Sequence, residues 1–369
     1  MNSTTSTYLD LVRFFAALLV FVHHLAYERI TGGSLSSLGM FGEDAVMVFF
    51  VLSGYVIAYV AAEKEQTPRE YFASRFARLY SVAVPALILT VLFDYAGQRL
   101  DPSFYIGRSN DSYPWARVLI SLIFANQFWF SDIRYFSNVP YWSISFECWY
   151  YILFGVVVFM KGGSRWVMLA VVVIAVGPPI VLLAPVWLLG VWVYRISARG
   201  IISVKAGWPL FLGSIALYLA YRYSEGGGHL TAWSDSWISP VLEPVQLHKA
   251  RFFLHDYVVG LLVALHFLGA GILAKADALN FGFLSHPIRI AAGYTFALYL
   301  LHYPLLHLLA SAAPWPPGDI RRTTILVAGT VIVIGLIGSV TEKKKHVWKR
   351  WLLTFWDNAA KRYIHQVHS

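Results

Sequence analysis

The chain has 369 residues, of which 58% are hydrophobic and only 13% are charged, and its net charge is +9. Ordinary globular proteins contain about 45–50% apolar and about 25% charged residues, so a water-soluble fold could not bury this much apolar surface. The composition therefore excludes a soluble enzyme and predicts a membrane protein that crosses the bilayer several times. In such a protein an excess of Lys and Arg marks cytoplasmic loops, so we expect no nucleic-acid partner.

Hydropathy distributes the expected membrane spans along the whole chain, because a bilayer core needs about 20 apolar residues per helix. Ten segments reach or approach this length: 8–27, 45–62, 80–97, 142–160, 165–183, 185–196, 208–222, 252–273, 289–312 and 322–340. Segment 116–130 is apolar but only 15 residues long, and it contains Asn126 and Gln127. It could therefore be an eleventh crossing or a re-entrant segment.

Basic residues indicate which side of the membrane each loop occupies, because cytoplasmic loops are rich in Lys and Arg. Loop 63–79 contains four basic residues and the segment after residue 341 contains seven, so both are expected in the cytoplasm. This places both termini inside, requires an even number of crossings and favours ten. We therefore predict an all-α polytopic membrane protein with one transmembrane domain over 1–340, a candidate re-entrant segment at 116–130 and a basic cytoplasmic tail over 341–369.

The first expected span contains ionisable residues, which are costly inside a membrane and therefore mark candidate functional sites. Arg13 and His24 are 11 residues apart, so three helical turns place them on one face, about 16–17 Å apart along the axis. Asp10 lies three residues before Arg13, within reach of an ion pair. The pattern suits an anionic ligand at the cytoplasmic end and proton transfer by an imidazole further along. It equally fits an Arg13 that reaches the inner headgroups and a His24 that bonds a neighbouring helix.

Charged residues flank the second expected span on both sides. Asp44 lies at its outer end, where it could also cap the helix. Arg75 and Arg78 follow on the cytoplasmic side, three residues apart, so they would line one face of a helix. Guanidinium pairs bind phosphates through bidentate hydrogen bonds, which fits a phosphorylated cytosolic ligand such as coenzyme A. Anchoring on anionic lipid would explain the same two residues.

Polar residues also occur in two later spans. Glu147 lies four residues after Ser143 on the same helical face, among Trp and Tyr residues. Its carboxylate could orient a histidine on another helix, or it could pair with a structural arginine. His302 and His307 lie in an otherwise apolar helix, but His, Cys, Asp and Glu nowhere show the close spacing of a zinc site. We therefore predict no metal site.

Taken together, the sequence resembles the acyltransferase-3 family of integral membrane O-acyltransferases. Five stretches match in chain order: LDLVRFFAALLVFVHHL at 9–25, VFFVLSGYVI at 48–57, RFAR at 75–78, WSISFE at 142–147 and LYLLHYP at 298–304. Family members carry an arginine, ten residues and then a histidine, a spacing that Arg13 and His24 fit and His23 does not. Phe14 and Cys148 stand where members usually have a small glycine and a second carboxylate. The chain resembles the stand-alone members rather than those with a fused SGNH-type domain.

The resemblance implies transfer of an acyl group, usually acetyl, from a cytosolic acyl-CoA to a hydroxyl of a carbohydrate or glycolipid. It makes His24 the expected general base and Glu147 its expected orienting group. It implies that three arginines bind the donor: Arg13, Arg75 and Arg78. Four further residues are expected to support the site: Asp10, Asp44, Ser143 and His302. Acyl-CoA is expected to act as a co-substrate, with no bound cofactor.

The expected location is a bacterial inner membrane, with membrane lipid around the protein and a cell-envelope polysaccharide as the typical acceptor. A separate periplasmic transferase as partner stays open, as does an acylated His24 that carries the acyl group in place of general-base catalysis. The main alternative function is a transporter or flippase for an anionic glycolipid or solute, although no internal repeat supports it. The adjacent Glu43 and Asp44 keep a membrane-embedded glycosyltransferase as a second alternative.

Overall fold

The structure is a computed structural model that describes residues 2–107, 109 and 112–367, with side chains described up to residue 358. Within these residues the fold contains helices and no strand, as predicted. Eight helical segments are long and apolar enough to cross a membrane. Their principal helices are α1 (Ser3–Leu25), α4 (Gly42–Glu63), α5 (Pro68–Leu100), α8 (Trp142–Phe159), α10 (Pro178–Arg199), α13 (Phe253–Lys275), α15 (Thr295–Ala312) and α16 (Ile320–Val340).

The remaining two expected spans are also helices, but they are shorter. Helix α9 (Gly162–Val176) has 15 residues and α11 (Gly207–Tyr223) has 17. At 1.5 Å per residue these helices measure about 23–26 Å, against a hydrocarbon core of about 30 Å. A helix therefore lies at each of the ten expected positions, and eight segments have the length that a crossing needs.

Two expected boundaries were wrong. Segment 165–183 is divided at Gly177, which has a positive φ of 79° and separates α9 from α10. The pair Pro178–Pro179 then opens α10 at positions where no helical N–H bond is lost. Segment 289–312 is divided at Gly293, between the short helix α14 (Ser285–Ala292) and α15.

Segment 116–130 does not form an eleventh crossing. Only its first part is helical, in α7 (Pro114–Leu122), which has nine residues and therefore measures about 14 Å. The chain then turns at Phe124 and Trp129, both with positive φ. Asn126 and Gln127 are buried, and Asn126 accepts a hydrogen bond from Ser145 of α8. The segment is thus a short helix and a packed loop, and its re-entry into the membrane stays a prediction.

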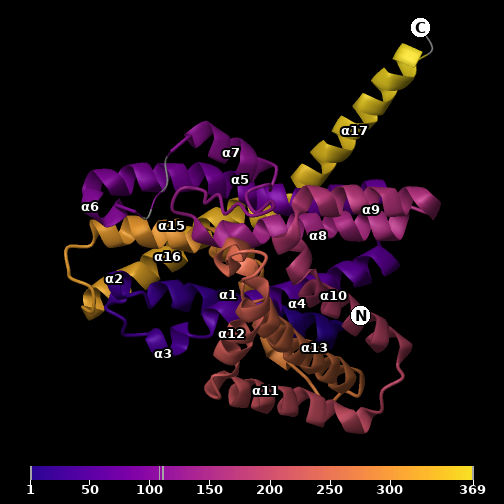
Figure 1. Cartoon of the computed structure of the whole chain (residues 1–369), viewed down its shortest axis with the longest axis horizontal. Helices are drawn as coiled ribbons and strands as arrows, with labels where there is room; N and C mark the ends of the chain where they lie inside the picture. Colours follow the sequence, from indigo (N-terminus) through magenta and orange to yellow (C-terminus); the bar gives the residue numbers. More distant parts are fainter. Residues whose placement is uncertain (1, 108, 110–111, 368–369) are drawn as a thin grey trace.

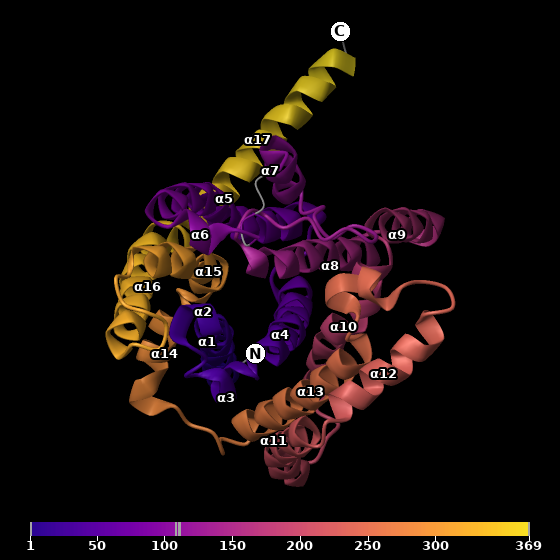
Figure 2. The same cartoon turned by 60° about the vertical axis from the view of Figure 1, so that its left-hand side comes forward.

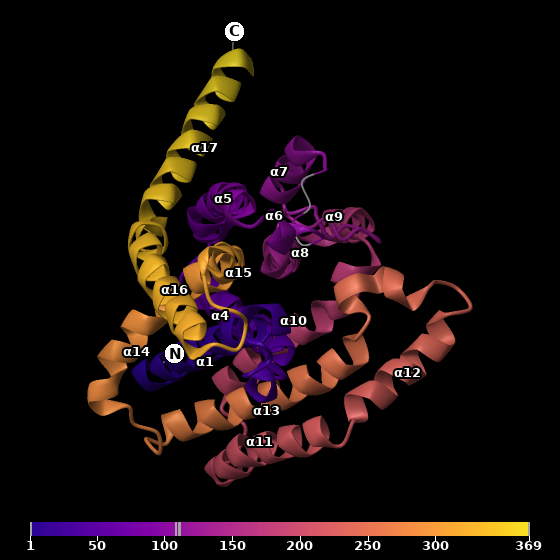
Figure 3. The ribbon, with the colours of Figure 1, turned by 90° about the vertical axis from the view of Figure 1, so that its left-hand side faces the viewer.

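The other described elements are short connections and one long terminal helix. They are α2 (Glu28–Thr31), α3 (Ser36–Gly39), α6 (Pro102–Tyr105), α12 (Gly226–Ile238), α17 (Lys345–Val367), and the 3₁₀ turns η1 (Val139–Tyr141), η2 (Val204–Ala206), η3 (Pro244–Ala250), η4 (Gly282–Leu284) and η5 (Glu342–Lys344). The expected basic tail is therefore largely helical. Helix α17 continues from α16 and projects out of the bundle (Figures 1 and 3).

The bundle is organised around α1 and α4. These two helices pack against each other near the centre of a ring that the other long helices form (Figure 2). Helix α15 packs against both α1 and α5, and α13 packs against α4, α10 and α11. Residues of α1, α4, α5, α8 and α15 are therefore brought together in the middle of the protein, far apart as they are in the sequence.

Helices α4 and α10 approach each other at two glycines. A Cβ added at Gly54 would lie 2.0 Å from the carbonyl oxygen of Trp187, and one added at Gly190 would lie 1.9 Å from that of Val51. Small residues at such positions let membrane helices pack backbone to backbone. The pair Ser53-Gly54 is therefore a packing site, and the Ser53 hydroxyl accepts a hydrogen bond from the Trp187 indole.

Helix α5 is much longer than a membrane span requires. Its 33 residues measure about 50 Å, and Thr67 caps its start by accepting a hydrogen bond from the N–H of Glu70. Helix α17 packs along its beginning. Arg69 joins the two helices through an ion pair of 2.5 Å to Asp357 and a hydrogen bond to the carbonyl of Leu353.

Candidate functional site

Helix α1 holds Arg13 and His24 in one continuous helix, so the predicted three-turn spacing on one face is confirmed. The helix begins after Asn2, whose side chain accepts a hydrogen bond from the N–H of Thr5. Asp10 and Arg13 form the predicted ion pair at 3.1 Å. His24 is buried near the opposite end of the helix.

His24 forms a hydrogen bond with His302 of α15. Nδ1 of His24 lies 3.0 Å from Nε2 of His302, and it also lies 3.0 Å from the carbonyl oxygen of Val20. Nδ1 of His302 lies 2.8 Å from the carbonyl oxygen of Leu298. A carbonyl oxygen can only accept, so both Nδ1 atoms carry hydrogen, and Nε2 of His302 accepts from His24. The partners thus assign a tautomer in which Nε2 of His24 has a free lone pair, as a base or nucleophile requires.

Aromatic rings surround His24 on the side away from Arg13, and one arginine bonds the nearest of them. The ring of Tyr303 lies 4.5 Å from the His24 ring and that of Tyr27 lies 5.4 Å away, between centroids. Arg29 donates a hydrogen bond to the Tyr303 hydroxyl. Burial raises the pKa of Tyr27, and Tyr303 and Glu43 raise it further. Tyr27, Arg29 and Tyr303 were not among the predicted site residues, although Tyr27 and Arg29 follow His24 by only three and five residues.

A narrow inner cavity, which we name the arginine cavity, lies between α1, α4, α5, α8 and α15. Its lining includes Arg13, Arg78, Ser143, Glu147 and Tyr299, together with a row of α4 residues from Val46 to Ile57. Arg13 and Arg78 therefore converge on one cavity, as expected for groups that bind one ligand. Ser143 lies in its wall, where its hydroxyl bonds that of Tyr299 at 2.7 Å.

The arginine cavity extends toward His24. Val46 and Ile57 are 11 residues apart on α4, so the row between them covers about 16 Å. Helix α4 begins at the level of His23, because a Cβ on Gly42 would lie 2.1 Å from the Cβ of His23. Val46 is about one helical turn further along, and Tyr299 is one turn from His302. The cavity thus runs from the two arginines to the neighbourhood of the histidine pair.

The expected pairing of Glu147 with a histidine was wrong. Its carboxylate accepts hydrogen bonds from the hydroxyls of Ser53 and Tyr151, at the arginine end of the cavity. His302, expected only as a supporting residue, instead holds the position next to His24. Glu147 lines the same cavity as Arg13 and Arg78 and acts electrostatically on both arginines.

Arg75 does not join Arg78 in the cavity. Its guanidinium binds the carboxylate of Glu65 at 2.9 Å, and both side chains are buried. It also lies over the ring of Tyr71. Three residues correspond to 300° of helical rotation, so the side chains of Arg75 and Arg78 point about 60° apart. Glu65, which lies just before the start of α5, is on the side of Arg75 and pairs with it. Arg75 therefore has a structural partner, whereas Arg78 lines the arginine cavity.

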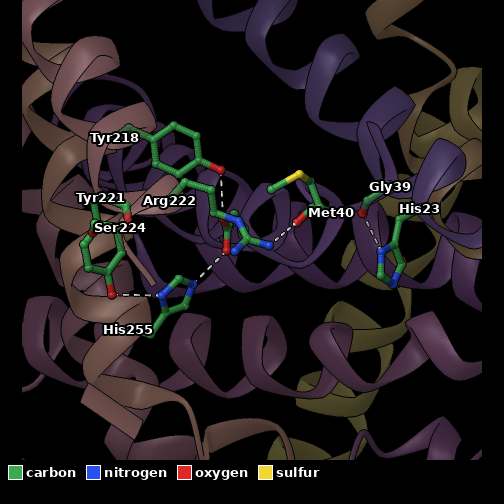
Figure 4. Close-up of polar contacts among 9 residues, drawn as sticks. His23, Gly39, Met40, Tyr218, Tyr221, Arg222, Ser224 and His255 are labelled. Carbon is green, nitrogen blue, oxygen red and sulfur yellow. Dashed lines mark hydrogen bonds and ion pairs between the residues drawn. The ribbon is translucent and has the colours of Figure 1, made fainter. Parts of the chain in front are cut away.

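Asp44 lies in a separate buried network that joins α4 to α11 and α13. Figure 4 shows its partners Tyr218, Arg222 and His255. Its carboxylate accepts hydrogen bonds from Tyr218 at 2.7 Å and from Nε2 of His255 at 2.9 Å, and Arg222 lies 3.6 Å away. It lies in the first turn of α4 but makes no capping bond with the helix N-terminus. His23 is likewise structural, since Nδ1 bonds the carbonyl oxygen of Gly39 at 2.7 Å.

One acidic residue of this region, Glu342, was not among the predicted site residues, because it lies in the segment expected to be the basic tail. Glu342 accepts hydrogen bonds from the N–H groups of Phe296 and Ala297 at the start of α15. It also acts electrostatically on Arg13 and Arg78. A carboxylate directly before three lysines is the only sequence signal that could have indicated it.

Comparison with known proteins identifies the family to which the chain belongs. A family model described as an acyltransferase domain, that of acyltransferase family 3, matches residues 6–341. The chain belongs to this acyltransferase family. The match covers every residue of the His24–His302 pair and of the arginine cavity.

Three curated relatives have names that describe acyl transfer. The peptidoglycan O-acetyltransferase OatA of Listeria monocytogenes is 23% identical over 89% of this chain and 54% of its own length. The O-acetyl transferase of Shigella phage Sf6 is 29% identical over 45% of this chain and 50% of its own. Acyltransferase MdmB of Streptomyces mycarofaciens is 29% identical over 39% and 36%. The chain thus spans between about a third and about half of the length of these relatives, and no solved structure matches it.

Proposed function

We propose that the protein is a membrane O-acyltransferase that moves an acyl group, in the simplest case acetyl, from acyl-CoA to a hydroxyl of a carbohydrate or glycolipid. The family and the names of two relatives support O-acyl transfer. The observation that carries the proposal is the hydrogen-bonded pair of His24 and His302, which leaves a lone pair on Nε2 of His24.

In this reaction Nε2 of His24 takes the proton of the acceptor hydroxyl while the oxygen attacks the thioester carbonyl. The tetrahedral intermediate collapses, the C–S bond breaks, and the coenzyme A thiolate leaves and receives that proton. His302 keeps His24 in the required tautomer and accepts the Nδ1–H of the imidazolium that forms. The same lone pair would also serve the variant in which Nε2 is acylated first and then transfers the group.

The arginine cavity is the proposed donor site. Arg13 and Arg78 would hold the phosphates of coenzyme A, because guanidinium groups match phosphate oxygens in charge and geometry. The pantetheine arm would then extend along the row of α4 residues and carry the thioester toward His24. The cavity has a volume of only about 50 Å³ in this structure, so donor binding would have to move its lining side chains apart.

The proposal is tested by mass spectrometry of envelope glycans and lipid-linked sugars from wild-type cells, a deletion strain, and the deletion strain that expresses His24→Ala at the wild-type level. We expect an acyl-sized mass only in the wild type. If the mass persists in His24→Ala, the role of His24 is wrong but acyl transfer stands. If no glycan differs and a lipid-linked precursor accumulates in the deletion strain, a flippase replaces the proposed function.

A further inference from the structure

A wide, open cleft, which we name the Tyr27 cleft, lies just beyond the C-terminal end of α1. It is lined by Tyr27, Glu28, Arg29, Gly32 and Pro317, and its volume is about 680 Å³. Small-molecule sites in proteins typically measure about 300–1,000 Å³. The arginine cavity lies along the other side of the histidine pair, so the donor proposed above leaves this cleft unused.

The cleft shares side chains with the surroundings of His24. Tyr27 lines the cleft, and its ring also packs edge-on against the imidazole of His24. Arg29 lines the cleft and donates to Tyr303, the ring closest to His24 among its aromatic contacts. A molecule in the cleft would therefore contact the same side chains that enclose the proposed base, from the side opposite to the two donor-binding arginines.

The chemistry of the lining suits a polyhydroxylated ligand. Arg29 donates to His307 at 3.0 Å and to Tyr303, but its Nε–H is buried without a partner. Among the described residues, no ion pair involves Arg29 or Glu28, and the Glu28 side chain is exposed. A carboxylate accepts hydrogen bonds from sugar hydroxyls, a guanidinium donates to them, and an aromatic ring covers the apolar face of a pyranose.

The walls of the cleft are fixed by buried contacts. Arg322 of α16 is only 5% exposed and donates to the carbonyls of Ile30 and Trp315, which ties α2 to the loop before α16. Thr31 donates to the carbonyl of Leu25 and holds α2 against the end of α1. Gly32 has a φ of 65°, and a Cβ there would lie 3.0 Å from the N atom of Gly318. The cleft is thus preformed, which reduces the entropy lost on binding.

We propose that the Tyr27 cleft binds a sugar unit of the acceptor and presents one of its hydroxyls to His24. The inference rests on the proposed function for the identity of the reaction, but it concerns binding and can be tested without catalysis. Glu28 and Arg29 hold hydroxyls of the bound sugar, and Tyr27 packs against its ring. Donor and acceptor would then reach His24 from opposite sides.

The test measures binding of three neutral probes, chitotetraose, cellotetraose and maltotetraose, to the full-length protein in detergent by isothermal titration calorimetry. At least one probe is expected to bind the wild type. Glu28→Gln and Tyr27→Ala should each weaken that binding by about tenfold, the effect of losing a charge-assisted hydrogen bond or an aromatic contact. Glu243→Gln, which changes an exposed carboxylate elsewhere, is the matched control and should bind as the wild type does.

The outcomes separate the cleft from the reaction. Unchanged binding in both cleft variants, or no binding of any probe to the wild type, overturns the cleft as a carbohydrate subsite. Tyr27→Ala could disturb α1. In the case that this variant unfolds, the result for Glu28→Gln alone decides the test. If the bound probe is not acylated when acetyl-CoA is supplied, the proposed reaction fails for that sugar while the binding site stands.

Discussion

Nδ1 of His24 on α1 and Nε2 of His302 on α15 are joined by a hydrogen bond of 3.0 Å, although the residues are 278 positions apart in the sequence. Both rings are buried, and the second ring is anchored in turn to the carbonyl of Leu298. For the proposed reaction this pair would act as a base and its orienting group, with an imidazole in the place that a carboxylate holds in serine hydrolases.

His302 should therefore act as a positioning residue. We expect His302→Leu to lower kcat by roughly 10–100-fold, the range found when the partner that orients a metal-binding histidine is lost, with little change in KM for acetyl-CoA. His302→Gln should recover part of the activity, because a glutamine amide can still donate to Leu298 and accept from His24. Equal losses in both variants would show that His302 acts only through packing.

His24 itself should carry the larger effect. His24→Ala is expected to lower kcat by about 100- to 10,000-fold, the usual contribution of a general base. His23→Ala is the natural comparison, because His23 bonds the carbonyl of Gly39 and is expected to affect stability rather than the chemical step. The measurement is the steady-state rate of both purified variants, with folding checked by size-exclusion chromatography. Equal losses of kcat in the two variants would contradict the role of His24 as the base.

The two arginines of the RFAR stretch should behave differently. Arg78→Ala should raise KM for acetyl-CoA by about 10–100-fold, because charge-assisted hydrogen bonds to phosphate contribute about 1.5–3 kcal/mol. Arg75→Ala should instead destabilise the protein by about 3–5 kcal/mol, since it leaves the buried Glu65 unpaired. Kinetics and thermal unfolding of both variants check this, and a KM effect of Arg75→Ala without a lower Tm would contradict it.

The Asp44 network predicts a loss of stability rather than of catalysis. Asp44→Ala leaves His255 and Tyr218 without their acceptor in a buried position, so we expect about 3–5 kcal/mol of destabilisation. Thermal unfolding in detergent measures the loss. If Asp44→Ala unfolds at the same temperature as the wild type but transfers no acyl group, Asp44 acts in the reaction rather than in stability.

The contact between α4 and α10 makes its two glycines intolerant of any side chain. Gly54→Ala and Gly190→Ala would each place a methyl group within 2.0 Å of a carbonyl oxygen on the partner helix. We expect both variants to lower Tm strongly or to abolish stable expression. Gly213→Ala is the control, because a Cβ there meets nothing within 4 Å, and its Tm should match the wild type.

Helical periodicity made part of this site predictable. The common face of Arg13 and His24 and the ion pair of Asp10 with Arg13 depend on spacing within one helix. The partner of His24 depends on how α15 packs against α1, and no local pattern carries that information. The partners of Glu147 and Arg75 were wrongly predicted for the same reason. Ser53 and Tyr151 bind the carboxylate of Glu147, and Glu65 binds the guanidinium of Arg75. The division at Gly177 was missed because apolar residues continue on both sides of it.

The length of α5 bears on how the proposed donor, acyl-CoA, could reach Arg78. About 50 Å of helix cannot fit within a hydrocarbon core of about 30 Å, so roughly 20 Å must stand in water or among headgroups. Helix α17 is fastened to that emerging end by Arg69 and Asp357. The approach to Arg78 is therefore bordered by protein on at least one side, and a water-soluble co-substrate could reach it without first entering the lipid.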